Sequence, residues 1–276
     1  MPDPDDDLLR HYTDRYDEAG RLQRDLGPIE EARTREILSR YLPDAPARIL
    51  DVGGGPGAHA GWLAGLGYEV HLVDLVPIHV EQARAVAGIA SAEVGDARSL
   101  RHPDGGFDAV LLLGPLYHLP ERTDRITVVR EASRVSRSGA LVVAAAITRF
   151  ASAIDGLGSG FIDDPQFRSI VGEDLATGRH SNPTGDPAYF TTAFFHRPDE
   201  LASEMSAGGL GDVAVLAVEG ISWAAADVAA RWADPERRPV VEDLIRRLER
   251  EPSLLGASPH LLGVGRTRPA HDEPAP

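Results

Sequence analysis

The fold is decided by a short apolar segment that runs straight into a glycine-rich loop, Arg48-Ile49-Leu50-Asp51-Val52-Gly53-Gly54-Gly55-Pro56-Gly57. Glycines allow a tight backbone turn and let the chain approach a ligand without a Cβ in the way. The spacing Gly53-x-Gly55-x-x-Ala58 also satisfies a relaxed dinucleotide-binding fingerprint, so the loop alone does not identify the ligand. Asp51, two residues before Gly53, favours a cofactor with cationic groups, because it would repel the pyrophosphate of a dinucleotide.

Strands and helices alternate on the C-terminal side of this loop. The pattern predicts five strands, at residues 48–52, 69–73, 92–94, 107–113 and 140–147, with helices ending near residue 66 and spanning 78–87 and 124–136. Nearly continuous apolar strands of this kind are typical of a parallel sheet that is buried on both faces. We therefore expect an α/β fold with a doubly wound, mostly parallel sheet and the glycine loop after its first strand.

The rest of the chain surrounds this core. We expect an N-terminal helical lid in residues 1–44, the cofactor-binding core in 45–147, an insertion that caps the acceptor site in 148–197, the remainder of the core in 198–266 and a flexible tail in 267–276. The pattern predicts lid helices at 3–26 and 28–41, a helix near 164–175 in the insertion, a helix at 198–207, a strand at 213–218, a helical stretch at 223–250 and a last strand at 260–264.

The composition of the 276-residue chain limits its location and partners. At 42% hydrophobic residues it can bury a full core, yet it has no apolar run near the ~20 residues that a membrane span needs. The N-terminus is acidic, unlike that of a signal peptide. The absence of cysteine excludes disulfides, zinc–thiolate sites and cysteine nucleophiles. We expect a cytoplasmic protein with no membrane partner, either a monomer or a homodimer.

The net charge of the chain is −15, with a pI near 5.0. Nucleic-acid binding depends on basic patches that displace counterions from phosphates. The charge therefore argues against DNA or RNA as a partner and favours a small-molecule substrate.

Two further carboxylates follow strands of the predicted sheet. Asp74 ends the second strand, where a carboxylate can accept hydrogen bonds from both hydroxyls of a ribose. Asp96 follows the third strand, where it can accept from an adenine amino group while the next amide donates to a ring nitrogen. Asp74 alone does not discriminate, because it would serve NAD and a nucleoside cofactor equally. The whole set does, since successive strands end in the order that a nucleoside site requires: Asp51 with the glycines, then Asp74, then Asp96.

These segments resemble the successive motifs of the class I S-adenosylmethionine (SAM)-dependent methyltransferases. The matching stretches are Ile49–Gly57, the strand ending in Asp74, the Gly95-Asp96 pair and Phe107–Leu113, with one extra glycine, Gly54. The resemblance implies a seven-stranded, Rossmann-like sheet with an antiparallel seventh strand, SAM as cofactor and S-adenosylhomocysteine as product. It places the methionine part near Asp51 and Gly53, the ribose on Asp74, and the adenine between Leu75 and Asp96–Ala97. The cofactor-binding residues it implies are Asp51, Gly53, Gly55, Asp74, Leu75, Asp96, Ala97 and Leu113.

The segment after the fourth strand, Gly114-Pro115-Leu116-Tyr117-His118-Leu119, stands where the family binds its acceptor. It lacks the Asn/Asp-Pro-Pro-Tyr/Phe signature of DNA and protein-glutamine methyltransferases. His118 is a candidate general base because an imidazole titrates near neutrality, although it could instead cap the next helix or contact the SAM carboxylate. Tyr12 and Tyr16 share a helix face and could close over the cofactor or simply pack there. The catalytic candidates are His118, Tyr12, Tyr16 and Tyr117.

Aromatic residues gather in the insertion and suggest a cover for an apolar or aromatic acceptor: Phe161, Phe167, His180, Tyr189, Phe194, Phe195 and His196. A lone histidine such as His180 is more often a hydrogen-bonded loop residue than a catalyst. No histidine shows a metal-binding spacing such as His-Glu-x-x-His, so we expect no metal.

The N-terminal tyrosines, the 114–119 segment and the insertion together resemble natural-product methyltransferases of actinobacteria, in particular those that methylate indole C3 in pyrroloindoline formation. In that group, tyrosines and a histidine are implicated in removing a proton. O- or N-methylation of a small phenol or amine is the alternative. An NAD(P)-dependent oxidoreductase is disfavoured by Asp51 and by the lack of a Tyr-x-x-x-Lys pair, and a non-catalytic SAM-binding protein by the full set of cofactor residues.

Overall fold

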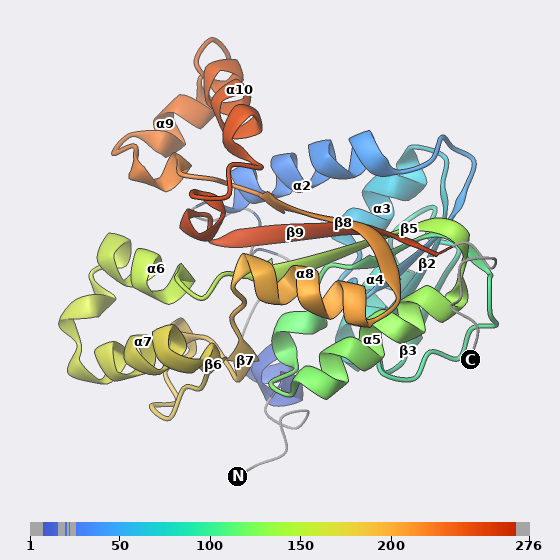
Figure 1. Cartoon of the computed structure of the whole chain (residues 1–276), viewed down its shortest axis with the longest axis horizontal. Coiled ribbons are helices and arrows are strands. Elements are labelled where there is room, and N and C mark those ends of the chain that lie inside the picture. Colours follow the sequence, from blue (N-terminus) through green and yellow to red (C-terminus); the bar gives the residue numbers. More distant parts are fainter. Residues whose placement is uncertain (1–7, 16–19, 21, 23–25, 269–276) are drawn as a thin grey trace.

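Seven strands pair into one sheet in the order β3-β2-β1-β4-β5-β9-β8 (Figure 1). The structure is a computed structural model that describes residues 8–15, 20, 22 and 26–268. The strands are β1 (Arg48–Val52), β2 (Glu69–Asp74), β3 (Ser91–Val94), β4 (Phe107–Leu112), β5 (Ser136–Ile147), β8 (Leu210–Ala217) and β9 (His260–Thr267). The doubly wound, mostly parallel α/β sheet expected from the sequence is confirmed.

Strand direction brings the ends of distant segments to one edge. β1 pairs in parallel with β2 and β4, and β4 pairs in parallel with β5. β9 is antiparallel to both of its neighbours, β5 and β8. The first residue of β9, His260, therefore lies at the edge where the parallel strands end, which we call the carboxyl edge.

Helices cover both faces of the sheet because successive strand residues point to opposite sides. Leu50 and Val52 pack with α5 (Arg122–Val135) and α8 (Pro198–Ala207). Ile49 packs on the opposite face with α2 (Gly27–Tyr41), α3 (Ala58–Gly65) and α4 (Pro77–Arg84). We call this second side the α2 face.

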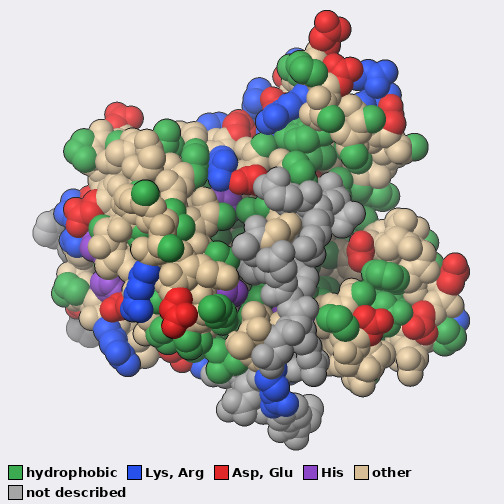
Figure 2. Space-filling model, turned by 180° about the vertical axis from the view of Figure 1, so that it is seen from behind, with side chains coloured by type: hydrophobic (Ala, Val, Ile, Leu, Met, Phe, Trp, Pro, Cys, Tyr) green, Lys and Arg blue, Asp and Glu red, His purple; other side chains and the backbone are tan. Residues whose placement is uncertain are grey.

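Two groups of helices extend beyond the sheet (Figure 1). The insertion forms α6 (Ala151–Ser159), α7 (Pro165–Thr177) and the short pair β6 (Arg179–His180) and β7 (Ala193–Phe194). The other group is α9 (Val228–Ala233) and α10 (Arg238–Leu248), which projects as a lobe with charged side chains of both signs (Figure 2). Among the described residues, no helix has the length and apolarity that crossing a membrane requires.

The N-terminal helix is described only in part, as a short segment from residue 8 that continues as the π-helix η1 (His11–Arg15). The rest of the helix expected over 3–26 lies outside the described residues, apart from positions 20, 22 and 26.

Three sequence expectations were wrong in detail. The insertion contains α6 as well as α7. Gly156 lowers the helix propensity of α6, so the sequence pattern does not reveal this helix. Packing requires a glycine there, because a Cβ at position 156 would lie 2.5 Å from the Phe167 ring on α7. The helical stretch at 223–250 is broken after α9, where Asp234 is extended as a residue before proline tends to be. The sheet continues to Thr267, whose hydroxyl accepts a hydrogen bond from Ala140 N at 3.0 Å, so residue 267 is not part of the tail expected over 267–276.

A buried ion network ties the helices of one face to the insertion. Arg125 on α5 forms a two-point ion pair with Glu204 on α8, at 2.7 and 2.8 Å, and both side chains are buried. Glu204 also accepts from His196 Nε2 at 3.1 Å, and the Arg125 guanidinium lies 3.6 Å from the centre of the Phe194 ring. Burial alone would raise the pKa of Glu204, but hydrogen bonds from Arg125 and His196 lower it to about 2.

Removing the negative charge of this network should destabilise the protein strongly. Glu204→Gln leaves the Arg125 charge buried without a counter-charge, so we expect the free energy of unfolding to fall by about 3–5 kcal/mol in urea denaturation at pH 7. The matched control is Glu121→Gln, because the ion pair of Glu121 with Arg179 is exposed. That variant should lose less than about 1 kcal/mol. Equal losses of unfolding free energy in the two variants would show that the buried ion pair stabilises the protein no more than the exposed one.

The same network predicts an acid-sensitive contribution to stability. The pKa of Glu204 in the folded protein lies below its ordinary value of 4.5. Its stabilising effect is therefore complete above about pH 4.5 and is lost as the pH falls toward 2. Unfolding free energies measured across this range should fall less steeply for Glu204→Gln than for the wild type. Parallel pH profiles would show that Glu204 is not the group responsible.

Candidate active site

Two adjoining cavities lie at the carboxyl edge of the sheet. The smaller, of about 100 Å³, is lined by residues that follow β2, β3 and β4. The larger, of about 1480 Å³, extends from the glycine loop to the insertion, α2 and the start of β9. Tyr12, Gly53, Gly55 and Tyr117 line both cavities and so mark their junction.

The glycine loop packs closely against neighbouring segments. Gly53 has a φ of 70°, and a Cβ on it would lie 2.7 Å from Pro115 Cδ. Gly54, the extra glycine of the motif, has the same kind of constraint, since a Cβ there would lie 2.8 Å from Asp51 Oδ2. Larger residues at these positions would push the loop away from the strand that carries Asp51 or from the acceptor segment.

Asp51 is a fully buried carboxylate on β1 that faces the larger cavity. Neither of its oxygens has a hydrogen-bond partner in the part of the chain that the structure describes. Burial, together with the nearby Asp74 carboxylate, raises the pKa of Asp51 to about 7. A buried acid without a donor needs a ligand to supply one, and a cationic group satisfies this need best.

Asp74 at the end of β2 organises the loop beside it. Its Oδ2 accepts from Gly55 N at 2.8 Å and its Oδ1 accepts from Val76 N at 2.8 Å. His79 Nδ1 lies 3.3 Å from Oδ1. Because each carboxylate oxygen has two acceptor positions, Asp74 can hold the loop and still accept from hydroxyls of a ligand.

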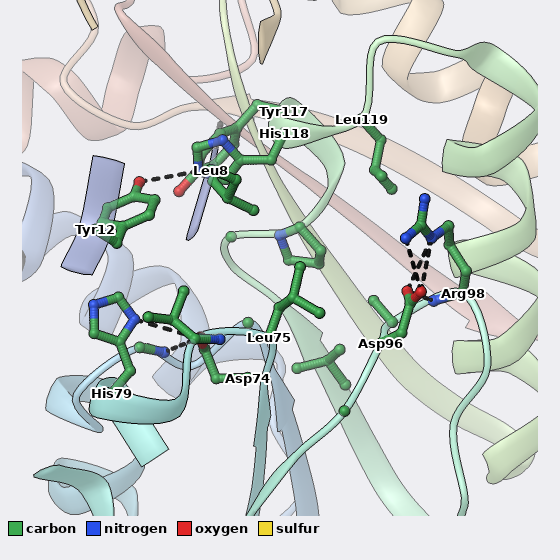
Figure 3. Close-up of a pocket in the computed structure, with 18 residues that line it drawn as sticks. Leu8, Tyr12, Asp74, Leu75, His79, Asp96, Arg98, Tyr117, His118 and Leu119 are labelled. Atoms are coloured by element: carbon green, nitrogen blue, oxygen red, sulfur yellow. Dashed lines mark hydrogen bonds and ion pairs between the residues drawn. The ribbon is translucent and has the colours of Figure 1, made fainter. Parts of the chain in front are cut away.

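Leu75, Asp96 and Ala97, the residues predicted to bind an adenine, also line the smaller cavity. Figure 3 shows Leu75 next to Asp74 and Asp96 apart from both. Arg98, which the motif search missed, lies beside them and donates to both oxygens of Asp96, at 2.9 and 3.0 Å. Burial would raise the pKa of Asp96, but the hydrogen bonds from Arg98 lower it below its ordinary value. Asp96 is thus an ionised acceptor at neutral pH.

These features fit the nucleoside cofactor that the motifs imply. The glycine loop leaves no side chain between β1 and the cavities, and the Asp51 carboxylate beside it has no donor among the described residues. Asp74, Leu75, Asp96 and Ala97 all line the smaller cavity. Leu113 lines the larger cavity instead.

Two of the predicted catalytic residues are hydrogen-bonded to each other although they are 106 positions apart. Tyr12 Oη lies 2.9 Å from His118 Nε2, and their rings meet edge to face (Figure 3). Tyr117 lies next to them, with its ring centre 4.7 Å from that of His118 and its hydroxyl donating to Leu113 O at 3.3 Å. Tyr16 lies outside the described residues.

The insertion supplies part of the expected aromatic lining. Five of the seven aromatic residues named from the sequence line the larger cavity: Phe161, Phe167, His180, Tyr189 and Phe195. The other two, Phe194 and His196, do not; they belong to the ion network of Arg125 and Glu204. His180 is a hydrogen-bonded loop residue, because its Nδ1 lies 3.0 Å from Asp174 Oδ2 and its Nε2 lies 2.9 Å from Tyr189 O.

Sequence reasoning missed Phe190, whose backbone is strained. It has a φ of 64° and a ψ of −165°, a region that is essentially restricted to glycine. Its ring centre lies 5.8 Å from that of His118 and 6.0 Å from that of His180. Strain of this kind is common at functional sites, and here it holds an aromatic ring on the cavity wall beside the Tyr12–His118 pair.

A second missed group lies at the opposite end of the larger cavity. The ligand atoms of Glu30, Glu219 and His260 all lie within 4.8 Å of one another. The three residues come from α2, from the segment after β8 and from β9, so no spacing along the sequence joins them. The expectation that no metal is bound stays a prediction.

Comparison with known proteins identifies the core of the chain. Residues 49–139 match the family model described as a methyltransferase domain. Over 149 residues, 52% of this chain, the sequence is 31% identical to the ubiquinone biosynthesis O-methyltransferase of Xanthomonas oryzae pv. oryzae (strain PXO99A). Over 121 residues, 40% of this chain, it is 37% identical to the 27-O-demethylrifamycin SV methyltransferase of Amycolatopsis mediterranei. The chain spans 60% and 43% of the length of these two relatives.

The fold also matches solved structures. A SAM-dependent methyltransferase of Thermotoga maritima, described as a possible histamine N-methyltransferase, superposes with a TM-score of 0.55 and 15% identity over 95% of this chain and 99% of that chain. At this identity the likeness shows the shared fold. The family match thus places a methyltransferase domain in residues 49–139, and the chain shares the fold of a solved SAM-dependent methyltransferase.

Proposed function

We propose that this chain is an enzyme that transfers the methyl group of SAM to an oxygen atom of a small, hydroxylated aromatic molecule. The observation that carries the proposal is the hydrogen bond between Tyr12, which lines both cavities, and His118, which lines the smaller one. A phenolic hydroxyl must lose its proton as it attacks a methyl group, and this pair can receive it.

Bound SAM supplies an electrophilic methyl group on a sulfonium. Asp51 compensates the positive charge of the methionine part, and Asp74 and Asp96 bind the adenosine part. Tyr117 and Phe190, which line the larger cavity, would orient the ring of the acceptor for attack on the methyl group. His118 Nε2 takes the proton, directly or through the Tyr12 hydroxyl, and its imidazole is suited to this near neutral pH.

The comparisons support oxygen as the methylated atom and a small molecule as the acceptor. The names of both relatives described above refer to small molecules, ubiquinone and rifamycin, and one of the two is named an O-methyltransferase. A further relative, from Rauvolfia serpentina, is named ajmaline N-methyltransferase and is 34% identical over 36% of this chain. The net charge of −15 favours a small acceptor over nucleic acid.

Methylation of an indole at C3 is the second candidate. The Tyr12–His118 pair supports it equally, because attack by C3 requires loss of the indole N–H proton and the pair can accept that proton. Mass analysis of products from matched phenols and indoles separates the two: a methylated phenol supports the first candidate, and a C3-methylated indoline-type product supports the second.

The first test of the function is binding. Calorimetric titration should show micromolar affinity for SAM and no binding of NAD(H). Methyl transfer from labelled SAM to a panel of phenols, indoles and amines then identifies the acceptor class. Binding of NAD(H) without SAM would refute the proposal, and the glycine loop would then be a dinucleotide site.

The elevated pKa of Asp51 predicts that SAM affinity depends on pH. Because the pKa of the free carboxyl is about 7, the acid is protonated below this pH and must lose its proton to pair with a cation. The dissociation constant should therefore rise by about tenfold for each pH unit below 7, with release of up to one proton on binding. Calorimetry in buffers of different ionisation enthalpy measures both quantities.

The control for this prediction is a pair of substitutions. Asp51→Asn should weaken SAM binding at pH 8 and abolish the pH dependence, whereas Asp104→Asn, at an exposed position away from both cavities, should change neither. Ionisation of SAM itself affects the wild type and both variants equally, so it cannot cause a difference between them. A pH dependence that survives in Asp51→Asn would assign it to another group.

Substitution of the proton-accepting pair should slow turnover without weakening SAM binding. We expect His118→Ala to lower kcat by about 10²–10⁴-fold and Tyr12→Phe to lower it less, because general-base catalysis is typically worth this much. Tyr68→Phe is the matched control, since its hydroxyl donates to Pro43 O away from both cavities. Unchanged turnover of His118→Ala, with SAM affinity intact, would show that His118 is not the base.

A further inference from the structure

Ser152 is a buried serine on the wall of the larger cavity, and the proposed reaction does not use it. It lies in the first turn of α6, is 7% exposed and lines this cavity. Its hydroxyl has no hydrogen-bond partner in the part of the chain that the structure describes. A buried hydroxyl without a partner destabilises the protein that carries it, so a ligand that supplies the partner binds with an advantage.

The start of α6 adds a second feature to the same wall. Phe150, the N-cap residue, gives the helix no side-chain hydrogen bond, and the first turn holds no acidic residue. Side chains of this turn therefore do not offset the partial positive charge that a helix carries at its N-terminus. Ala151 and Ser152 line the cavity here, so a hydroxyl donor and the positive end of a helix lie together on its wall.

Asp51 and Ser152 make opposite demands on what fills the larger cavity. The carboxylate of Asp51 requires a donor, which the proposed function takes from the methionine part of SAM. Ser152 can donate, and the helix end beside it favours an electron-rich oxygen. Asp51 is on β1 and Ser152 is in the helix that follows β5, with β4 between the two strands. Different parts of the ligands must therefore satisfy the two residues.

The charge of the cavity wall decides which kind of oxygen suits Ser152. Glu30, Asp155 and Glu219 also line the larger cavity, and among the described residues no Arg or Lys does. A carboxylate on the ligand would enter a space lined by carboxylates. A neutral carbonyl oxygen accepts the same hydrogen bond without this repulsion.

We propose that Ser152 and the start of α6 bind a neutral carbonyl oxygen of the acceptor, away from the methylated hydroxyl, and thereby determine acceptor specificity. This inference rests on the proposed function, because it takes the larger cavity as the acceptor site. Ser152 Oγ donates the hydrogen bond, and the helix dipole strengthens it. The substrate class is a phenol that carries a ketone or another neutral carbonyl group on a second part of the molecule.

Three phenols of matched length test the proposal on the full-length protein saturated with S-adenosylhomocysteine. They are 4-(4-hydroxyphenyl)butan-2-one, which has the carbonyl, 4-butylphenol, which has a methylene in its place, and 3-(4-hydroxyphenyl)propionate, which has a carboxylate. Calorimetry gives the dissociation constants. The quantity compared between proteins is the dissociation constant of the alkyl phenol divided by that of the ketone, so the greater hydrophobicity of 4-butylphenol cancels.

The discriminating variant is Ser152→Ala, which removes only the hydroxyl. The ratio should fall by about three- to tenfold relative to the wild type, as expected for one hydrogen bond, while the affinity for S-adenosylhomocysteine stays unchanged. The wild type should also bind the carboxylate more weakly than the ketone. The unfolding midpoint of the ligand-free variant should stay the same or rise, because alanine has no hydroxyl to bury and favours the helix. A serine that only stabilised the fold would give a lower midpoint.

Two control variants separate burial from contact with the cavity. Ser222 is buried and its hydroxyl has no partner among the described residues, yet it lines neither cavity, so Ser222→Ala should leave the ratio unchanged. Ser136 is buried too, but its Oγ donates to Ala132 O at 2.7 Å. Ser136→Ala should therefore lower the unfolding midpoint and leave the ratio unchanged.

Four outcomes would overturn the proposal. They are a ratio that is the same in the wild type and in Ser152→Ala, a lowered unfolding midpoint of Ser152→Ala, binding of the carboxylate as tightly as the ketone, and absence of binding of all three phenols. Failure of the wild type to bind S-adenosylhomocysteine would instead refute the proposed function, so the two failures are distinguishable.

Discussion

The parallel direction of β1, β2, β4 and β5 is the constraint on which the rest of the structure depends. A parallel sheet covered by helices on both faces offers no place for polar side chains within its strands, so they collect where the strands end. Asp51 and Asp74 reach the same edge for this reason. The antiparallel β9 adds His260 to that edge from a segment more than 180 residues later in the chain.

The Arg125–Glu204–His196 network links this framework to the chemistry. Arg125 Nη1 donates to Leu119 O at 2.8 Å and to Pro120 O at 2.9 Å, directly after His118. His196 belongs to the return of the insertion, where its backbone bonds to Ile147 O. One buried ion network thus fixes both the segment that carries the proposed base and the root of the insertion that lines the acceptor cavity.

The sequence could place the candidate cofactor residues at one edge of the sheet because they belong to consecutive strand–loop units. Asp51 with its glycines, and Asp74, each follow a strand that local apolar pattern reveals. The acceptor half was predicted only in part. Tyr12 and His118 were both named, but their contact depends on how the N-terminal helix docks, and no local pattern encodes that docking. Whether the cofactor and acceptor use these residues stays a prediction.

Phe190 and the Glu219–His260 pair were missed for physical reasons. The positive φ of Phe190 contradicts residue preference, so a search by propensity places a glycine there, not an aromatic ring. Glu219 and His260 meet because β8 and β9 form an antiparallel pair whose register is set by the core residues behind them. The helix α6 was missed because its Gly156 packs against Phe167, at the expense of helix propensity.

The distribution of charge within the site follows from what each half must bind. Asp51 is kept without a donor and at a raised pKa, which destabilises the protein alone and favours a state with a cation bound. Glu219 is buried to a similar degree, yet Ser258 Oγ, His260 N and His260 Nδ1 lie within hydrogen-bond distance of its oxygens. Two buried carboxylates at one edge of the sheet thus differ, because Asp51 lacks hydrogen-bond donors among the described residues and Glu219 has three.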